Sequence, residues 1–262
     1  MPRGQQRGQL ARDRGDDAAQ VRFSDGSSKA YDLVVGADGI RSTVRRLCFA
    51  GYEPQFTGYS IWRVLMPRPE WNVRPIWFMG LGRTFGVVPL STAQCYLAGV
   101  TKEPGNPRHA RAELRNLLRE RFGSFGGPIP ELLAAVTPAD EVVYTPAEEI
   151  LMPLPWIGRR VLVVGDAAHA STPFWAQGAS MAIEDVVVLA ELLALGNPIE
   201  ATLAAWQARR HPRCLFVQQG SLATGQRSHD ESPGALDRLY AHLRANGARD
   251  AEARYARLAE PI

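Results

Sequence analysis

The residues best placed to do chemistry follow a short apolar run in the second half of the chain. Residues 161–164 are apolar and mostly β-branched, which predicts a buried central strand. Gly165 comes directly after this run, and a glycine there allows a sharp turn and the close approach of a ligand to the backbone. The next residue, Asp166, carries a carboxylate that only accepts hydrogen bonds, so it suits the hydroxyl groups of a sugar-like chain.

A helix is expected to begin close to this strand end. Apolar residues recur at helical spacing over 177–195, which predicts a helix with one buried stripe. The predicted stripe consists of Ala179, Ala182, Val186, Leu189, Ala190 and Leu193. The amino end of this helix would direct free N–H groups and a partial positive charge toward residues 173–178. Strand, turn and helix together predict a site for a polyhydroxylated, partly anionic cofactor, at the sheet edge where open α/β folds bind ligands.

Composition places the chain among globular proteins. It has 262 residues, 45% of them hydrophobic and 22% charged, which is enough for a substantial core in one or two domains. The net charge of +3 is small, so we expect no nucleic-acid partner, and no run of about 18 apolar residues predicts a membrane span. The polar, arginine-rich start does not resemble a signal peptide. The three cysteines are far apart, which indicates neither a disulfide framework nor a metal site and favours the cytoplasm.

The order of predicted elements indicates an α/β chain with α+β character. Strands are predicted at 19–23, 31–35, 59–66, 75–79, 85–90, 94–100, 141–150 and 161–164. Helices are predicted at 42–49, 108–121, 130–136, 177–195 and 198–220, with a break at Pro212, and again toward the carboxyl end after an interruption near Ser232. The glycines Gly80, Gly82 and Gly86 are spaced to relieve a hairpin or bend rather than to hold a phosphate.

Two motifs in this chain resemble those of a known family. The first is Tyr31-Asp32-Leu33-Val34-Val35-Gly36-Ala37-Asp38-Gly39-Ile40-Arg41-Ser42. The second is Gly165-Asp166-Ala167-Ala168-His169, followed by Pro173, by Ala176-Gln177-Gly178-Ala179 and by Glu184-Asp185. They resemble the two flavin motifs of the FAD-dependent aromatic-ring monooxygenases, such as p-hydroxybenzoate hydroxylase and salicylate hydroxylase. Two motifs in the family's order are far more specific than either alone, and the resemblance runs from about residue 20 to about residue 220.

The resemblance implies an incomplete three-layer FAD-binding domain interleaved with an antiparallel-sheet substrate domain and followed by carboxyl-terminal helices. The implied segments are 1–57 and 151–196 for FAD binding, 58–150 for the substrate domain and 197–262 for the helices. The βαβ unit that opens the family, with its Gly-x-Gly-x-x-Gly turn, is missing from this sequence. Its absence would leave the central strands without a neighbour, so we expect low solubility or a homodimer. A cooperatively melting monomer would contradict this expectation.

The same resemblance implies which residues contact the cofactor. They are Asp38, Gly39, Arg41, Gly165, Asp166, Pro173, Gln177, Gly178 and Ala179. Several of these side chains have a second interpretation from their residue type alone. Asp166 contacts flavin or caps nearby backbone N–H groups, and Asp38 contacts flavin or belongs to an ordinary Asp-Gly turn. Arg41 contacts the cofactor or pairs with Asp38, and Gln177 reaches the flavin ring or caps the helix.

Substrate contacts in the family come from beneath the antiparallel sheet. The candidates here are Trp62, Arg63, Trp77, Phe78 and residues 173–177. The fork of donors on Arg63 could hold a carboxylate or an anionic ring oxygen, or it could form a surface ion pair. Trp62 and Trp77 are either stacking platforms or core aromatics. We expect His169 to pack or to bond to the backbone rather than to act in catalysis.

The activity implied is that of an FAD-dependent monooxygenase, an oxidoreductase. In the family, NAD(P)H reduces the flavin, O₂ adds to form a C4a-hydroperoxide, and an aromatic or heteroaromatic small molecule is hydroxylated. Because the flavin carries this chemistry, we assign no catalytic side chain and no metal. The alternative is a truncated, non-catalytic remnant or an interaction protein of the same fold. Flavin absorbance of the purified chain distinguishes the two readings.

Overall fold

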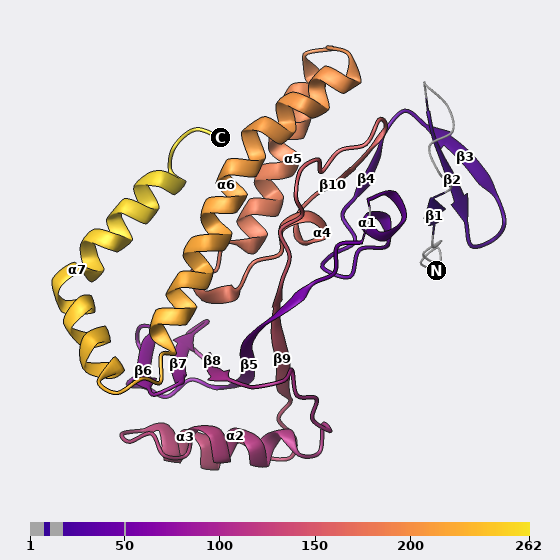
Figure 1. Ribbon diagram of the computed structural model, residues 1–262. Coiled ribbons are helices and arrows are strands. Elements are labelled where there is room, and N and C mark those ends of the chain that lie inside the picture. Colours follow the sequence, from indigo (N-terminus) through magenta and orange to yellow (C-terminus); the bar gives the residue numbers. More distant parts are fainter. Residues whose placement is uncertain (1–7, 11–17, 50) are drawn as a thin grey trace. The chain divides into compact units, whose positions relative to one another are not determined.

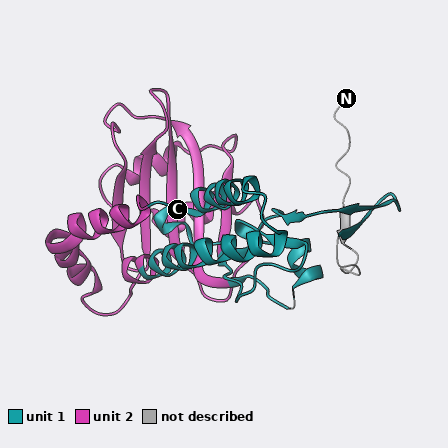
Figure 2. Ribbon diagram, turned by 90° about the horizontal axis from the view of Figure 1, so that it is seen from above, with its two compact units in different colours: residues 1–55, 148–223, 261–262 teal, residues 56–147, 224–260 magenta. Residues whose placement is uncertain are grey.

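The computed structural model describes residues 8–10, 18–49 and 51–262. The chain divides into two compact units, which alternate along the sequence (Figure 2). Unit 1 contains residues 1–55, 148–223 and 261–262, and unit 2 contains residues 56–147 and 224–260. The chain contains both helices and strands, and the strands form open sheets. This confirms the predicted α/β class with mixed character.

The described part of unit 1 holds two small sheets. β1 (Gly8–Leu10), β2 (Ala19–Phe23) and β3 (Ser28–Tyr31) form an antiparallel sheet, whereas β4 (Val34–Gly36) and β10 (Val161–Val163) pair in parallel (Figure 1). The single strand predicted at 31–35 is therefore two strands in different sheets. The sequence pattern could not show this change, because it depends on which distant strands become the neighbours.

The helices of unit 1 follow the strands of the parallel pair in the sequence, one after β4 and the others after β10. They are α1 (Thr43–Cys48), α4 (Asp166–His169), the 3₁₀ turn Pro173–Trp175, α5 (Gly178–Ala194) and most of α6 (Ile199–Ser228). α1 begins as predicted after Ser42, whose hydroxyl accepts a hydrogen bond from the Arg45 N–H at 2.9 Å. A hydroxyl in this position satisfies one of the unpaired donors at a helix start.

The break predicted at Pro212 is wrong. α6 continues for 30 residues through Pro212 and ends at Ser228 rather than near 220. A proline removes one backbone hydrogen bond and crowds the preceding turn, but it does not by itself force a helix to stop. Trp206 and Cys214 are buried on either side of Pro212, so packing maintains the helix across it. Despite the length of this element, no helix in the described residues is apolar enough to cross a membrane.

The stripe that α5 buries shares only Leu189 with the one predicted. Its buried residues are Met181, Asp185, Val188 and Leu189. Val186 and Leu193, which belong to the predicted stripe, are 56% and 39% exposed. The prediction failed because it counted only apolar positions, whereas the centre of the true stripe is occupied by the carboxylate of Asp185.

Unit 2 is built on one five-stranded sheet with the order β6-β7-β8-β5-β9. The strands are β5 (Gln55–Pro67), β6 (Ile76–Gly80), β7 (Arg83–Pro89), β8 (Gln94–Lys102) and β9 (Val142–Glu149). β6 and β7 form a hairpin with Gly82 in its turn at φ 64°, so the interpretation of these glycines as hairpin residues is confirmed. β5 pairs antiparallel with β8, and β8 with β7, as the predicted antiparallel sheet requires.

Helices flank this sheet. α2 (Leu114–Phe122) and α3 (Ile129–Ala135) lie along one face (Figure 1), and α7 (Ala235–Leu258) completes the unit. α2 begins six residues later than predicted, because residues 111–113 form turns instead. The core of unit 2 lies between the sheet and helices α2 and α3. Its largest fully buried side chains include Trp62, Phe85, Leu118 and Phe122.

Replacement of Gly99 by alanine tests how tightly this core is packed. A Cβ added at Gly99 would overlap the ring of Phe122, which is fully buried and cannot move aside freely. We therefore expect Gly99→Ala to lower the free energy of unfolding by about 1 to 3 kcal/mol, as overpacked cores generally show. Gly126→Ala is the matched control, because a Cβ there meets nothing within 4 Å. Urea unfolding followed by fluorescence measures both, and equal stabilities of the two variants would contradict the expectation.

Candidate functional site

The two sequence motifs meet at one edge of the parallel pair. Val34 lies opposite Val161 and Gly36 opposite Val163, and the N–H of Val164 donates to the Gly36 carbonyl at 3.0 Å. Because both strands run in the same direction, the loops that follow them leave the sheet at the same edge. The strand ends of the two motifs are therefore adjacent in unit 1 although they are far apart in sequence.

Arg45 ties the two motif loops together. Its guanidinium is fully buried and donates hydrogen bonds to the carbonyls of Ile40 and Ala167, each at 2.7 Å, and of Tyr52 at 3.0 Å. Ile40 belongs to the first motif and Ala167 to the second. Burial lowers the pKa of Arg45, but a guanidinium remains charged at physiological pH. Sequence analysis missed this residue, because its position inside a short helix gives no sign of its burial.

Both carboxylate oxygens of Asp38 accept hydrogen bonds from neighbouring residues of the chain. Its Oδ1 accepts from the Ser42 hydroxyl at 2.5 Å, and its Oδ2 accepts from the N–H groups of Thr43 at 2.6 Å and Val44 at 3.1 Å. The carboxylate thus satisfies the free N–H groups at the start of α1. Arg41 pairs with Glu148 at 2.5 Å rather than with Asp38, and its side chain is 57% exposed.

The carboxylate of Asp166, in the second motif, is exposed and available to a ligand. Gly165, which precedes it, has φ 57° and ψ −142°, a conformation that is accessible essentially to glycine alone. Asp166 is exposed, and within the described part of the chain its carboxylate accepts no hydrogen bond. Of the two interpretations that its residue type allowed, capping of nearby backbone is therefore not what the structure contains.

The start of α5 completes this edge. Pro173–Trp175 forms a 3₁₀ turn, Ala176 takes a left-handed conformation at φ 53°, and the helix begins at Gly178. Gln177 makes no side-chain cap; its amide instead donates to the Trp175 carbonyl at 3.4 Å. The N–H groups of the first turn of a helix have no partner within the helix, so this uncapped end offers donors and a partial positive charge.

Beneath these loops lies a buried ionic cluster that sequence analysis missed. Asp185 of α5 accepts hydrogen bonds from the Gly165 N–H at 2.8 Å, from His169 Nε2 at 2.6 Å and from Arg210 Nε at 2.8 Å. His169 thus bonds to a side chain rather than to the backbone, and it packs against Trp156 with ring centroids 5.2 Å apart, which is the other alternative that we expected. Arg210 also donates to Glu184 at 2.7 Å. The signal was present in the sequence: a helical stripe through positions 181, 185 and 188 contains one acidic residue.

The chemistry of this cluster is that of ion pairs rather than of a metal. Ligand atoms of His169, Asp185 and Cys214 lie within 4.8 Å of one another, a grouping that could hold a cation. However, Arg210 is fully buried beside them, donates to Asp185 and contacts the Cys214 sulfur at 3.7 Å. Its guanidinium already supplies the positive charge that the buried carboxylate requires.

Protonation of the cluster follows from these contacts. Burial opposes a charge on His169, but its hydrogen bonds to Asp185 and to the Cys214 sulfur outweigh this effect and raise the pKa of His169 to about 10. Burial likewise opposes a charge on Asp185, yet hydrogen bonds from His169, Arg210 and Gly165 lower the pKa of Asp185 overall. At neutral pH the pair therefore consists of an imidazolium and a carboxylate.

The candidate substrate residues in unit 2 lie on two faces of the sheet. Successive residues of a strand point to opposite faces, so Trp62 and Arg63 are separated. Trp62 is fully buried in the core, where its indole N–H donates to the Thr101 hydroxyl at 2.9 Å, so it does not line an open surface. Phe78 packs against the same core. Arg63 is exposed on the other face, and it makes no hydrogen bond or ion pair with the described residues.

On the face of the sheet opposite the core, Arg63 and Trp77 belong to one row of directly opposed residues across four strands. Arg63 lies opposite Ala98, Ala98 opposite Gly86, and Gly86 opposite Trp77. Directly opposed residues of neighbouring strands share a face. A Cβ added at Gly86 would lie 2.7 Å from the Trp77 ring, so the indole rests on the glycine, and it remains 48% exposed. The row therefore presents an aromatic ring and a free guanidinium with two small residues between them.

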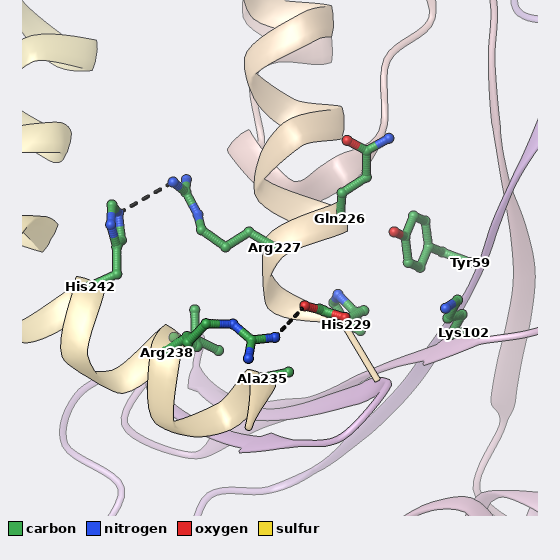
Figure 3. A pocket seen from close by; sticks show the side chains of 10 residues that line it. Tyr59, Lys102, Gln226, Arg227, His229, Ala235, Arg238 and His242 are labelled. Carbon is green, nitrogen blue, oxygen red and sulfur yellow. Dashed lines mark hydrogen bonds and ion pairs between the residues drawn. The ribbon is translucent and has the colours of Figure 1, made fainter. Parts of the chain in front are cut away.

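A cavity of about 590 Å³ lies elsewhere in unit 2, between the carboxyl end of α6, the start of α7 and the sheet (Figure 3). Several cationic side chains and Tyr59 line it. Lys102 pairs with Glu231 at 3.0 Å and Arg238 with Asp230 at 3.2 Å. Much of the positive charge is thus compensated within the protein, and none of the motif residues lines the cavity.

Comparison with known proteins finds a family of FAD-binding proteins whose match includes both motifs. The sequence profile described as "FAD binding domain" matches residues 3–220. The chain belongs to this FAD-binding family. It is 37% identical over 217 residues to the aurachin C monooxygenase/isomerase of Stigmatella aurantiaca, covering 81% of this chain and 55% of that protein. It is 33% identical over 227 residues to the 2-heptyl-3-hydroxy-4(1H)-quinolone synthase of Pseudomonas aeruginosa, covering 84% and 58%.

A solved structure of the same family has the same fold. Klebsiella pneumoniae HpxO, in complex with FAD and uric acid, matches with a TM-score of 0.85 and 26% identity, over 95% of this chain and 64% of that one. These relatives include FAD-dependent monooxygenases and hydroxylases. This member of the family spans 55% to 58% of the length of the two curated relatives named above.

The residues at the sheet edge of unit 1 suit part of an FAD molecule. A Cβ added at Gly178 would lie 3.9 Å from both Asp166 Oδ1 and the Ser171 hydroxyl, so the helix start is directly beside the carboxylate without crowding it. An open acceptor beside an uncapped helix end fits a ligand with both hydroxyl groups and negative charge. The sequence contains no Gly-x-Gly-x-x-Gly turn for the pyrophosphate.

The His169–Asp185 pair predicts how stability depends on pH. The pKa of His169 is raised on folding from 6.5 to about 10, so the pair stabilises the chain fully below about pH 6.5 and this contribution is lost as pH rises through 10. We expect the urea midpoint to fall between about pH 7 and pH 10, and to fall less in His169→Gln. His242→Gln, at a more exposed ion pair, is the control. Equal slopes for the parent and His169→Gln would show that the pair does not have this role.

Proposed function

We propose that unit 1 binds FAD at the shared edge of β4 and β10, and that the protein acts as an FAD-dependent monooxygenase. The observation that carries this proposal is the open carboxylate of Asp166 beside the uncapped start of α5. Asp166 would accept hydrogen bonds from cofactor hydroxyl groups. The N–H groups near Gly178 and Ala179 would stabilise negative charge on the flavin ring.

The other motif residues shape this edge. Pro173 and Gln177 flank the path to the helix start, and Gly165 sets the direction of Asp166. Asp38, Gly39 and Arg41 would contribute through the loop that Asp38 holds against α1, with Gly39 leaving the backbone open to the cofactor because no atom lies within 4 Å of an added Cβ. We retain all nine residues as cofactor-binding positions on this basis.

Bound FAD would supply electron transfer from NAD(P)H and the activation of O₂ for insertion of one oxygen atom into an aromatic substrate. The relatives support an aromatic or heteroaromatic substrate, because their names include a quinolone product and urate. The task of the protein is then to hold the cofactor, to orient the ring and to exclude water.

The open face of unit 2 is suited to the substrate. Trp77, whose indole rests on Gly86, would stack on an aromatic ring, and the free guanidinium of Arg63 would bind a carboxylate or an anionic ring oxygen. Arg63 has no partner of its own among the described residues, which favours this role over a surface ion pair.

We further propose that the protein is a homodimer in the cytoplasm. Exposed apolar residues on α5, such as Ile183 at 65% and Val186 at 56%, support the expected homodimer. Cys95 and Cys214 are buried and form no disulfide with the described residues, which is in keeping with the proposed cytoplasmic location.

Substitution of Gly178 tests the FAD site. Gly178→Leu has room to fold, because the added Cβ has no neighbour closer than 3.9 Å, but its side chain would fill the space at the helix start. We expect this variant to lose the flavin absorbance that the parent gains on incubation with FAD. Gly247→Leu, on α7, is the control and should keep it. A parent that stays colourless with FAD favours the non-catalytic remnant, and a yellow Gly178→Leu places the cofactor elsewhere.

Substitution of Arg63 tests the substrate face. In a preparation that oxidises NAD(P)H in response to substrate, Arg63→Ala should raise KM for salicylate about tenfold, which corresponds to about 1.4 kcal/mol. The KM for phenol, which lacks the carboxylate, should not change. Arg74→Ala, another exposed arginine of unit 2, is the charge-matched control. A uniform change for both probes would assign Arg63 a structural role instead.

A further inference from the structure

Asp185 lies at the centre of unit 1 without belonging to the open edge that would meet a cofactor. It is 0% exposed, on the buried stripe of α5. Its Oδ2 accepts both the Gly165 N–H at 2.8 Å and His169 Nε2 at 2.6 Å, and its Oδ1 accepts Arg210 Nε at 2.8 Å. Three donors from two segments of the chain, residues 165–169 and α6, thus converge on one carboxylate.

Only a carboxylate satisfies this arrangement. An ionised carboxylate offers two oxygens and no hydrogen, so every approaching N–H finds an acceptor. An asparagine of the same shape would place an NH₂ group against one of the donors. Either orientation of that amide sets two donors against each other, and the loss of the negative charge weakens the hydrogen bond that the Gly165 N–H keeps.

The bond to Gly165 fixes the turn that precedes Asp166. Gly165 also packs closely on the same helix, because a Cβ added there would lie 3.0 Å from the Cβ of Ala182. Asp185 is one helical turn further along α5 from Ala182, approximately on the same side. Hydrogen bond and packing therefore hold the turn against α5, and the unusual backbone conformation of Gly165 directs Asp166 outward.

We propose that Asp185 is a positioning residue, which holds the Gly165-Asp166 turn so that the Asp166 carboxylate is presented to FAD. Arg210 serves as the buried counter-charge that keeps Asp185 ionised and oriented, and His169 supplies the second donor on the same oxygen. This inference rests on the proposed FAD site, but the state of the turn can be measured without FAD.

The Gly165 amide can be observed by itself. The chain contains two Val-Gly steps, Val35-Gly36 and Val164-Gly165, so labelling with carbonyl-¹³C valine and ¹⁵N glycine isolates two amide signals in an HNCO spectrum. A hydrogen bond to a charged carboxylate should shift the Gly165 proton downfield and slow its exchange with solvent. In Asp185→Asn, the Gly165 signal should move upfield and exchange faster, while Gly36 serves as the internal reference.

FAD affinity provides the functional measurement. We expect Asp185→Asn to raise the Kd for FAD at least about tenfold, measured by flavin fluorescence during titration of the full chain. Glu184→Gln is the matched control, because it removes a carboxylate from the adjacent position, bonded to Arg210 and Arg213 but not to Gly165. This control should leave the Gly165 signal in place and the Kd within about twofold.

A second variant covers the case in which Asp185→Asn does not fold. Asp185→Leu with Arg210→Met removes the acceptor and the counter-charge together, so Arg210 is not left as an unpaired buried charge. The proposal expects this double variant to fold, to bind FAD at least about tenfold more weakly and to show fast exchange at Gly165. An unmoved Gly165 signal in Asp185→Asn, or parental FAD affinity in the double variant, overturns it. A parent that binds no FAD refutes the proposed function, and the Gly165 signal then still decides whether Asp185 holds the turn.

Discussion

The parallel pairing of β4 with β10 is the constraint on which the rest of unit 1 depends. Each strand has three residues, and parallel neighbours necessarily end at the same edge. This geometry brings the loop of Asp38 beside the turn of Asp166. Such short strands bury little surface, so the pair needs support from outside the sheet. Buried side chains provide it from both sides: Arg45 bonds to both loops, and Asp185 bonds to the backbone of the second.

The buried side chains that support the pair are charged, so they select one arrangement of the loops more than they add to stability. Arg45, Asp185 and Arg210 are each fully buried, and each makes several hydrogen bonds to defined partners. A buried ion pair offers little net stability over an apolar pair of the same size, but removal of one partner typically costs about 3 to 5 kcal/mol. The cluster therefore tolerates few alternative arrangements. A site that must present one carboxylate in one direction benefits from that restriction.

Unit 2 meets a different requirement, because one face of its sheet packs in the core and the other face is only partly covered. Trp62 and Phe78 pack in the core with α2 and α3, whereas Arg63 and Trp77 belong to the open face. Between Arg63 and Trp77 lie the small residues Gly86 and Ala98, and the Trp77 ring rests on Gly86. Under the proposed function, unit 1 would offer acceptors and helix-end donors to the cofactor, and unit 2 would offer an aromatic and cationic surface to a small molecule.

The sequence by itself determined the family, the order of most strands and helices, and the two motif loops, because these depend on local composition and on spacing within a few residues. It identified Asp166 and the start of α5 correctly as neighbours of a strand end. It could not separate Trp62 from Arg63, since strand alternation assigns faces only once the core is known. It also missed Asp185, Arg210 and the continuation of α6 through Pro212. Those features depend on partners distant in the chain, and only tertiary packing decides which charged group is buried, with which partner, and whether a helix is held together across a proline.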